Sequence, residues 1–283
     1  MKKVSKSIPA KTNFTLDVLG VEGKFHNIES LVASVNLFDV VTVSKRNDKK
    51  ITITNKGIPV DCPPSENNAF KTASLFMQRF DTLGVNITIN KGIPVGAGLG
   101  GSSADIAGVL LAMKELFSIS ADMKTLAEKL GSDATYMLSG GYAVMRGKGE
   151  KIKKIDGNEK IYMLAILSEQ KVCAKDCYKK YDNQKKHPVA TTKHAVKAFI
   201  NKDMELFYKL IKNDLEPASK KLAPEIDFNL TALKKAGAIT SFVSGSGPTA
   251  IGVFKGKAER NKAFAKLSPL FEKKILKIET VNN

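Results

Sequence analysis

The chain has 283 residues, of which 43% are hydrophobic and 26% charged, a composition typical of a globular protein large enough for two domains. Its formal net charge of +17 and pI near 9.6 favour phosphate-bearing partners. The lysines, however, alternate with apolar residues and accompany no zinc finger, paired recognition helix or aromatic RNA motif. We therefore expect solvated lysine-rich surfaces and no nucleic-acid partner.

The cysteines and the hydropathy indicate the compartment. Three cysteines, at positions 62, 173 and 177, have no disulfide-framework spacing, which favours a reducing environment. Cys173 and Cys177 lack a second ligand pair, so we expect no metal site there. No run of about 18 apolar residues occurs, and the basic N-terminus precedes no apolar segment. We expect a cytoplasmic protein that does not enter a membrane.

The first half of the chain predicts strands and one helix. Alternating apolar residues predict strands over residues 6–20, 35–46, 49–57 and 85–91. Charged residues separate the second and third of these, so we expect the two to form a hairpin. Helical spacing predicts a helix within 65–84, with Ser65 as its cap.

The second half repeats a mixed pattern. A helix is expected from about Ala104, and another over 121–130. The pattern restarts near Lys160, and two or three helical segments follow between residues 191 and 235. A strand, a glycine turn and a strand are expected over 238–256, then a helix over 258–273 and a strand over 275–280. The restart near Lys160 indicates a second domain.

The stretch VGAGLGGSSAD, residues 95–105, carries the most specific signal in the sequence. It fits Gly-x-Gly-x-x-Gly, but no strand ending in an acidic residue follows, as a dinucleotide site requires, and no P-loop lysine is present. A glycine loop with two serines between a strand and a helix points backbone N–H groups at an anion, typically a phosphate. The alternative is a flexible surface turn with a serine cap.

These residues resemble the GHMP small-molecule kinases. IPVGAGLGGSSAD is similar to their phosphate-binding signature, PAKTNFTLDVLG to their first motif and SFVSGSGPTAIGVF to their third glycine-rich motif, in the family's order. Within that superfamily, the segments PAKTNFTL, GKFHNIESLV, LGSDATYMLSGGYAVMRGKGE and CYKKYD most resemble the 4-diphosphocytidyl-2-C-methyl-D-erythritol kinases.

The resemblance implies a fold and an activity. The fold would be α+β, a two-domain GHMP kinase architecture with a ribosomal protein S5 domain 2-like N-terminal domain and a ferredoxin-like C-terminal domain. Residues 1–156 would form the ATP-binding domain, and residues 157–283 would complete the acceptor site. The activity would be phosphorylation of the 2-hydroxyl of 4-diphosphocytidyl-2-C-methyl-D-erythritol (CDP-methylerythritol), with ATP and Mg²⁺, in non-mevalonate isoprenoid precursor biosynthesis.

The resemblance also implies two catalytic residues. Asp133 would be the general base on the acceptor hydroxyl, and Lys11 the cation that orients Asp133 and offsets developing charge. Spacing alone would favour a helix cap for Asp133 and a surface position for Lys11.

The family's binding residues carry over by motif. Those implied for ATP lie in the glycine loop and at two flanking positions: Pro94, Gly96, Gly98, Leu99, Gly100, Gly101, Ser102, Ser103, Ala104, Asn67 and Lys91. Asn67 is alternatively a helix cap, and Asp105 is either a magnesium ligand or, more simply, an acid in the first helical turn.

The implied acceptor residues fall into two groups. Phe25 and Tyr178 would stack on the cytosine, and His26 would hydrogen-bond its edge. Gly245, Ser246 and Gly247 would face the acceptor diphosphate or line the cleft between domains. The alternatives are an ordinary loop histidine and a plain hairpin turn.

Partners and competing functions complete the expectations. We expect a small-molecule substrate and a monomer or weak homodimer. A second hypothesis is another GHMP kinase acting on mevalonate, homoserine or a sugar. A third is a catalytically silent basic binding protein on the same fold.

Overall fold

The chain folds into two compact units, in a computed structural model that describes residues 2–60, 62–184 and 190–282. Unit 1 consists of Met1–Ala10, Leu37–Val95 and Gly100–Gly140, and unit 2 of Lys11–Asn36, Gly96–Leu99 and Gly141–Asn283. The chain therefore passes between the units several times. The predicted mixture of helices and sheets is confirmed, and the domain division at residues 156/157 stays a prediction.

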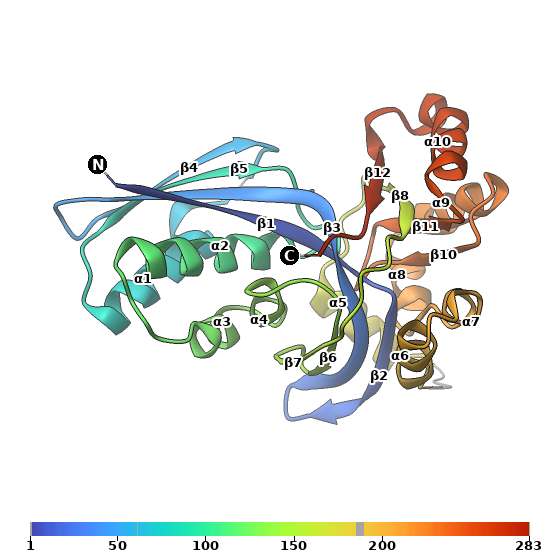
Figure 1. The fold of residues 1–283 in the computed structure, drawn as a ribbon, viewed down its shortest axis with the longest axis horizontal. Helices are drawn as coiled ribbons and strands as arrows, with labels where there is room; N and C mark the ends of the chain where they lie inside the picture. The colour runs from blue at the N-terminus through green and yellow to red at the C-terminus, as the bar shows by residue number, and fades with distance from the viewer. Residues whose placement is uncertain (1, 61, 185–189, 283) are drawn as a thin grey trace. The chain divides into compact units, whose positions relative to one another are not determined.

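Unit 1 combines strands with helices that cover them (Figure 1). Its elements are the first part of β1 (Lys3–Asn13), the last part of β3 (Phe25–Lys45), β4 (Ile51–Gly57), the short helix η1 (Pro64–Glu66), α1 (Asn68–Phe80), β5 (Val85–Lys91), α2 (Gly101–Leu116), α3 (Lys124–Leu130) and α4 (Ala134–Met137). The core forms where Val41, Ile87 and Ile89 of the strands meet Phe76 of α1 and Val109 of α2, all fully or almost fully buried.

The predicted hairpin of β3 and β4 is wrong. β5 lies between them, antiparallel to β3 and parallel to β4, with Ile51 opposite Val85. The inward side chains of β5 are completely buried, whereas those of β4 are half-buried or exposed, as expected for a central and an edge strand. Gly84 contributes to this order, because its N–H donates to the Asp48 carbonyl at 2.7 Å and holds the end of β3 beside the start of β5.

Two helix starts differ from the prediction. The cap of α1 is Asn67, whose Oδ1 accepts the Ala69 N–H at 2.9 Å, and Ser65 lies in η1. The helix after the glycine loop begins at Gly101, three residues before Ala104, because Gly100 adopts the left-handed backbone (φ 79°) that allows the chain to turn directly into α2.

Unit 2 contains two groups of strands and the remaining helices (Figure 1). Its elements, besides parts of β1 and β3, are β2 (Thr15–Glu22), β6 (Ala143–Gly147), β7 (Lys151–Lys154), β8 (Tyr162–Ile166), α5 (Ala174–Asp182), α6 (Thr192–Ile200), α7 (Met204–Lys209), β9 (Lys212–Asn213), α8 (Glu216–Leu222), α9 (Glu225–Lys235), β10 (Thr240–Val243), β11 (Ala250–Phe254), α10 (Lys257–Phe271), η2 (Glu272–Lys274) and β12 (Ile275–Glu279).

The strands of unit 2 pair in two arrangements. β3 pairs with β2 and β6, and β6 continues to β7. A second sheet has the order β10-β11-β8-β12 and is antiparallel throughout. The predicted strand, turn and strand over 238–256 is confirmed as β10 and β11, and the predicted last helix and strand as α10 and β12. Four helices, α6 to α9, occupy the region for which two or three were expected.

A carboxylate of β2 joins the start of α6 to the strands. The Asp17 side chain, 1% exposed, accepts the N–H of Thr191 at 2.9 Å and that of Thr192 at 2.8 Å. Thr191 itself makes no side-chain cap. A carboxylate at a helix N-terminus satisfies free N–H groups and opposes the helix dipole, so Asp17 stabilises α6 from a distant part of the chain.

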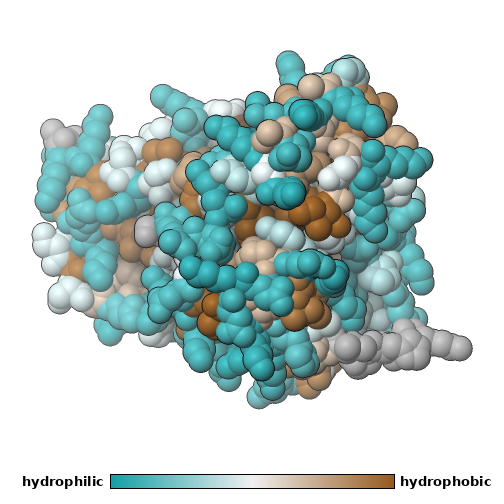
Figure 2. Space-filling model, turned by 45° about the vertical axis from the view of Figure 1, so that its right-hand side comes forward, coloured by the Kyte–Doolittle hydropathy of each residue, from teal (hydrophilic) through white to brown (hydrophobic). Residues whose placement is uncertain are grey.

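Hydrophilic side chains cover most of the face in Figure 2, with apolar residues in separate patches between them. Of the helices in the described part of the chain, none has both the length and the apolar character that crossing a bilayer requires.

Candidate functional site

Unit 2 brings three predicted motifs together at Lys11. The Lys11 backbone N–H donates to the Leu99 carbonyl at 2.9 Å, so the first motif lies against the glycine segment Gly96–Leu99. The Lys11 ammonium, 4% exposed, donates to Asn13 Oδ1 at 2.6 Å, and Asn13 Nδ2 donates to Ser30 Oγ at 2.7 Å. Lys11 is therefore a buried, oriented cation, and the surface alternative is wrong.

The third motif packs on the same glycine segment. Ser244 Oγ donates to the Gly98 carbonyl at 3.1 Å. A Cβ on Gly98 would lie 2.3 Å from the Ser244 carbonyl oxygen and 2.8 Å from that of Gly247. A Cβ on Gly245 would lie 3.3 Å from Lys11 Nζ. The two glycine-rich loops thus approach each other, backbone to backbone, beside the lysine.

Two residues that the sequence did not single out hold the third motif. Asn213 Nδ2 donates to the carbonyls of Val243 and Gly245, each at 2.7 Å. Ser219 Oγ donates to the Ser246 carbonyl at 3.0 Å. These contacts fix the turn from positions far away in the chain, so a plain hairpin turn is an incomplete description of it.

In unit 1, the two serines lie in the first turn of α2, which begins at Gly101. Gly100 occupies the cap position and no side chain caps the helix there, which leaves the first N–H groups of α2 to other partners. Ser102 Oγ accepts a hydrogen bond from Asn68 Nδ2. Ser102 is exposed and Ser103 half-buried, whereas Gly101 and Ala104 are buried. Free N–H groups at a helix N-terminus attract anions, and the phosphate-binding role of these residues stays a prediction.

A buried ion cluster includes a residue of this helix, Asp105. Lys91 Nζ pairs with Asp39 and, at 2.9 Å, with Asp105 Oδ2, and all three side chains are nearly or fully buried. Asp39 Oδ1 also accepts the N–H groups of Gly92 and Ile93, at 2.8 and 2.9 Å. Through Asp105, the cluster ties β3 and β5 to the N-terminal half of α2. The ATP role of Lys91 stays a prediction.

Asp105 is the least satisfied member of the cluster. Its Oδ1 is buried without a hydrogen-bond partner among the described residues. Burial raises the pKa of Asp105 to about 7, in spite of the neighbouring Lys91 ammonium. Asp105 thus pairs with Lys91, and the first-turn alternative is wrong, because α2 begins at Gly101 and its first turn contains no acid.

The predicted cytosine residues gather in unit 2. The His26 and Tyr178 rings stack, with centroids 4.5 Å apart and planes at 21°. His26 Nε2 lies 2.9 Å from Asp182 Oδ1. Phe25, 57% exposed, has the Lys148 ammonium over its ring, 5.3 Å from the centroid. Asp182 and Lys148 were missed by sequence reasoning, although both lie in segments quoted for the resemblance.

The remaining predicted residues have these positions. Asp133, in unit 1, occupies the cap position of α4, but its side chain makes no cap hydrogen bond, so the capping alternative does not describe it. Asn67 does cap α1. Pro94 is half-buried and Gly96 exposed. Lys11 and Asp133 belong to different units, and their pairing stays a prediction.

Known proteins resemble the chain in sequence and in fold. The sequence-family model of the GHMP kinases N-terminal domain matches residues 67–147, and the family model of the GHMP kinases C-terminal domain matches residues 195–273. A protein of Clostridium tetani (strain Massachusetts / E88) named 4-diphosphocytidyl-2-C-methyl-D-erythritol kinase is 33% identical over 266 residues, which cover 91% of this chain and 93% of that protein.

Solved structures agree. A crystal structure of 4-(cytidine 5'-diphospho)-2C-methyl-D-erythritol kinase superposes with a TM-score of 0.80 at 25% identity, covering 99% of this chain and 100% of that one. The mevalonate kinase of L. major, in complex with R-mevalonate, shares the fold with a TM-score of 0.77 at 16% identity, covering 99% and 96%. The predicted resemblance is confirmed, and the chain belongs to the GHMP kinases, a family of ATP-dependent small-molecule kinases.

Proposed function

We propose that this chain transfers the γ-phosphoryl group of ATP to the 2-hydroxyl of CDP-methylerythritol, a step of non-mevalonate isoprenoid precursor biosynthesis. The names and extent of the relatives support this substrate. The structural observation that carries the proposal is the meeting of the Lys11 motif, the Gly96–Leu99 segment and the Ser244–Thr249 turn in unit 2. Three motifs far apart in sequence are held together there by hydrogen bonds.

In this proposal Asp133 accepts the proton of the acceptor hydroxyl as its oxygen bonds to the γ-phosphorus. The bond from that phosphorus to the β–γ bridging oxygen breaks, and ADP leaves. The Lys11 ammonium offsets the charge that develops on the transferred group. The hydrogen bond from Lys11 Nζ to Asn13 Oδ1 holds the lysine side chain in place, so the side chain requires little further ordering during the reaction.

The residues at the start of α2 fit a nucleotide phosphate. The uncapped N–H groups after Gly100, and the Ser102 and Ser103 hydroxyls, are donors suited to phosphate oxygens. We propose that Asn67 and Lys91 lie on the adenine side of the nucleotide, as the resemblance implies. No group of three or more His, Cys, Asp or Glu side chains in the described ranges could hold a metal ion. We therefore propose that Mg²⁺ enters with the nucleotide and neutralises its phosphates.

The aromatic group in unit 2 suits a pyrimidine. Tyr178 and Phe25 offer ring faces, and Lys148 and His26 add hydrogen-bonding groups beside them. His26 stacks on one face of the Tyr178 ring, so we propose that the pyrimidine stacks on the other face. Gly245, Ser246 and Gly247 are proposed to face the acceptor diphosphate.

The proposal includes the setting of the enzyme. We propose a cytoplasmic protein that acts on a small molecule as a monomer or weak homodimer, without nucleic-acid or membrane partners.

The test is a coupled assay of ADP release. The purified protein receives ATP and Mg²⁺ with CDP-methylerythritol, mevalonate, homoserine or galactose in parallel. We expect turnover with the CDP compound alone, and a loss of roughly 10²–10⁴-fold in kcat for Asp133→Asn, the usual contribution of a general base. The matched control is Asp122→Asn, an exposed aspartate, which should keep full activity. Turnover with another acceptor, or an active Asp133→Asn, would refute the substrate or the base.

A further inference from the structure

A basic pocket of about 350 Å³ lies in unit 2, and none of its lining residues is proposed for catalysis. The hairpin of β6 and β7 forms one side. Val144 lies opposite Lys153 and Arg146 opposite Lys151 in this hairpin, so Val144, Arg146 and Lys153 share one face. Helix α6 forms the other side through Lys193, Val196 and Ile200, which lie on one stripe of the helix.

The pocket has an excess of positive charge. Arg146, Lys153, Lys154 and Lys193 line it, against two acids, Glu29 and Asp156. Glu29, 3% exposed, is already paired with Arg146, whose Nε and Nη2 both lie 2.7 Å from Glu29 Oε1. Within the described ranges, the side chains of these three lysines make no ion pair or hydrogen bond with another residue. Three ammonium groups and one aspartate therefore remain for a ligand.

The pocket also has an apolar wall. It consists of Val144 from β6, Ile155 after β7, and Val196 and Ile200 from α6. Val144 is 4% exposed and Ile200 is 56% exposed, so the wall runs from the protein interior to the surface. Cations beside an apolar surface match a molecule with an anionic group and a short hydrocarbon body. We propose that this pocket binds a small organic anion, a monoester of phosphate, with its phosphate on the lysines and its hydrocarbon on the valine and isoleucine side chains.

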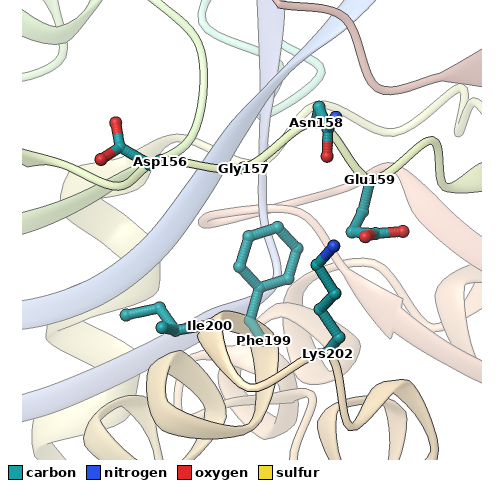
Figure 3. Close-up of a pocket in the computed structure, with 7 residues that line it drawn as sticks. All are labelled: Asp156, Gly157, Asn158, Glu159, Phe199, Ile200 and Lys202. Carbon is teal, nitrogen blue, oxygen red and sulfur yellow. The ribbon is translucent and has the colours of Figure 1, made fainter.

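A neighbouring pocket provides an internal comparison (Figure 3). It has about 360 Å³ and shares Asp156 and Ile200 with the basic pocket. Its charged lining is Asp156, Glu159 and Lys202, so its balance is acidic. In Figure 3 the Phe199 ring points from α6 toward Gly157, and the Lys202 side chain extends toward the segment that carries Glu159. Two pockets of similar size and opposite charge balance are thus lined by the consecutive stretches 153–156 and 156–159, and only the first suits an anion.

The test uses a local fluorescence reporter. The chain contains no tryptophan, so Ile200→Trp, at an exposed position that lines both pockets, gives a single tryptophan signal. The full chain is titrated with hexyl phosphate, inorganic phosphate and hexanol at constant ionic strength. We expect saturable binding of hexyl phosphate, at least ~10-fold tighter than inorganic phosphate because part of the alkyl chain leaves water. Hexanol should give no saturable change.

Lysine variants locate the site. Lys153→Ala with Lys193→Ala should weaken hexyl phosphate binding about 10-fold or more, because both ammonium groups face the phosphate. Both lysines are exposed, so the variant should keep its melting temperature. Lys202→Ala removes one positive charge from the neighbouring pocket and should change the affinity less than about 2-fold. Absent saturation, equal affinity for inorganic phosphate, or equal losses in both lysine variants would overturn the proposal.

Discussion

Replacing Gly98 by alanine tests whether the glycine segment must lie directly against the third motif. Gly98 has φ 74°, a left-handed backbone that costs a residue with a Cβ roughly 1–2 kcal/mol. The new Cβ would lie 2.3 Å from the Ser244 carbonyl oxygen, about 1 Å closer than an ordinary carbon–oxygen contact. Both neighbouring atoms belong to backbone, so the turn itself must move. Overpacking of this kind costs a further ~1–3 kcal/mol.

Gly96 provides the matched control. It has nearly the same backbone, with φ 69°, but a Cβ there would meet only the Lys171 side chain, at 3.9 Å. Gly96→Ala should therefore cost about 1–2 kcal/mol from the backbone alone, and Gly98→Ala about 2–5 kcal/mol from both causes. The difference between the two variants isolates the contact between the loops.

Thermal unfolding and ADP release measure the two variants. Gly98→Ala should lower Tm about two to three times as far as Gly96→Ala, since Tm follows the free energy of unfolding. It should also lower kcat/KM about 10²-fold, as expected when catalytic groups move by about 1 Å. Equal effects of the two substitutions on Tm and on kcat/KM would refute the close packing of the two loops.

Further predictions concern the buried carboxyl and the aromatic group. The pKa of Asp105 is raised from 3.8 to about 7 in the folded protein. Between about pH 4 and pH 7, the folded protein therefore holds a proton on Asp105 that the unfolded chain has released. The free energy of unfolding consequently falls as pH rises through this range. Relative to the wild type, Asp105→Asn should therefore gain at least ~1 kcal/mol in free energy of unfolding between pH 5 and pH 7.5 in urea titrations; a pH-independent difference would contradict this. Asp182→Ala removes the partner of His26 and should raise KM for CDP-methylerythritol about 10-fold, with KM for ATP unchanged; a rise in KM for ATP instead would oppose this placement. Lys148→Met keeps the aliphatic stem over Phe25 and should weaken acceptor binding alone, measured by calorimetry; an unchanged affinity would exclude Lys148 from the acceptor side.

The three motifs could be predicted from the sequence because each is a short run with a strict pattern. Gly98 and Ser244 lie in such runs, but the contact between them was not predicted. The order of the strands could not be predicted, because alternation tells which face of β4 is buried and not which strand lies beside it. Local spacing therefore identified the elements, and long-range pairing chose their neighbours.

The supporting residues were missed for a similar reason. Asp39 and Lys91 are 52 positions apart, and Asp39 looks like one polar residue in a strand. Nothing in its local sequence marks it as the partner of a buried lysine. Asn213 and Ser219 likewise hold the third motif by side-chain hydrogen bonds to its carbonyls, which leave no pattern in the sequence. Such residues become visible only when the fold brings them to the site.

The hydrogen bonds that Asp17 accepts from the start of α6 have a consequence for folding during synthesis. Asp17 is synthesised early, but the N–H groups that its buried carboxylate accepts belong to Thr191 and Thr192, 174 and 175 positions later. Burying an ionised carboxylate without partners is strongly unfavourable, so β2 must stay hydrated on the ribosome until α6 has emerged. Unit 2 is thus completed late in translation, and a nascent chain stopped before residue 191 would leave its first strands open to proteases and chaperones.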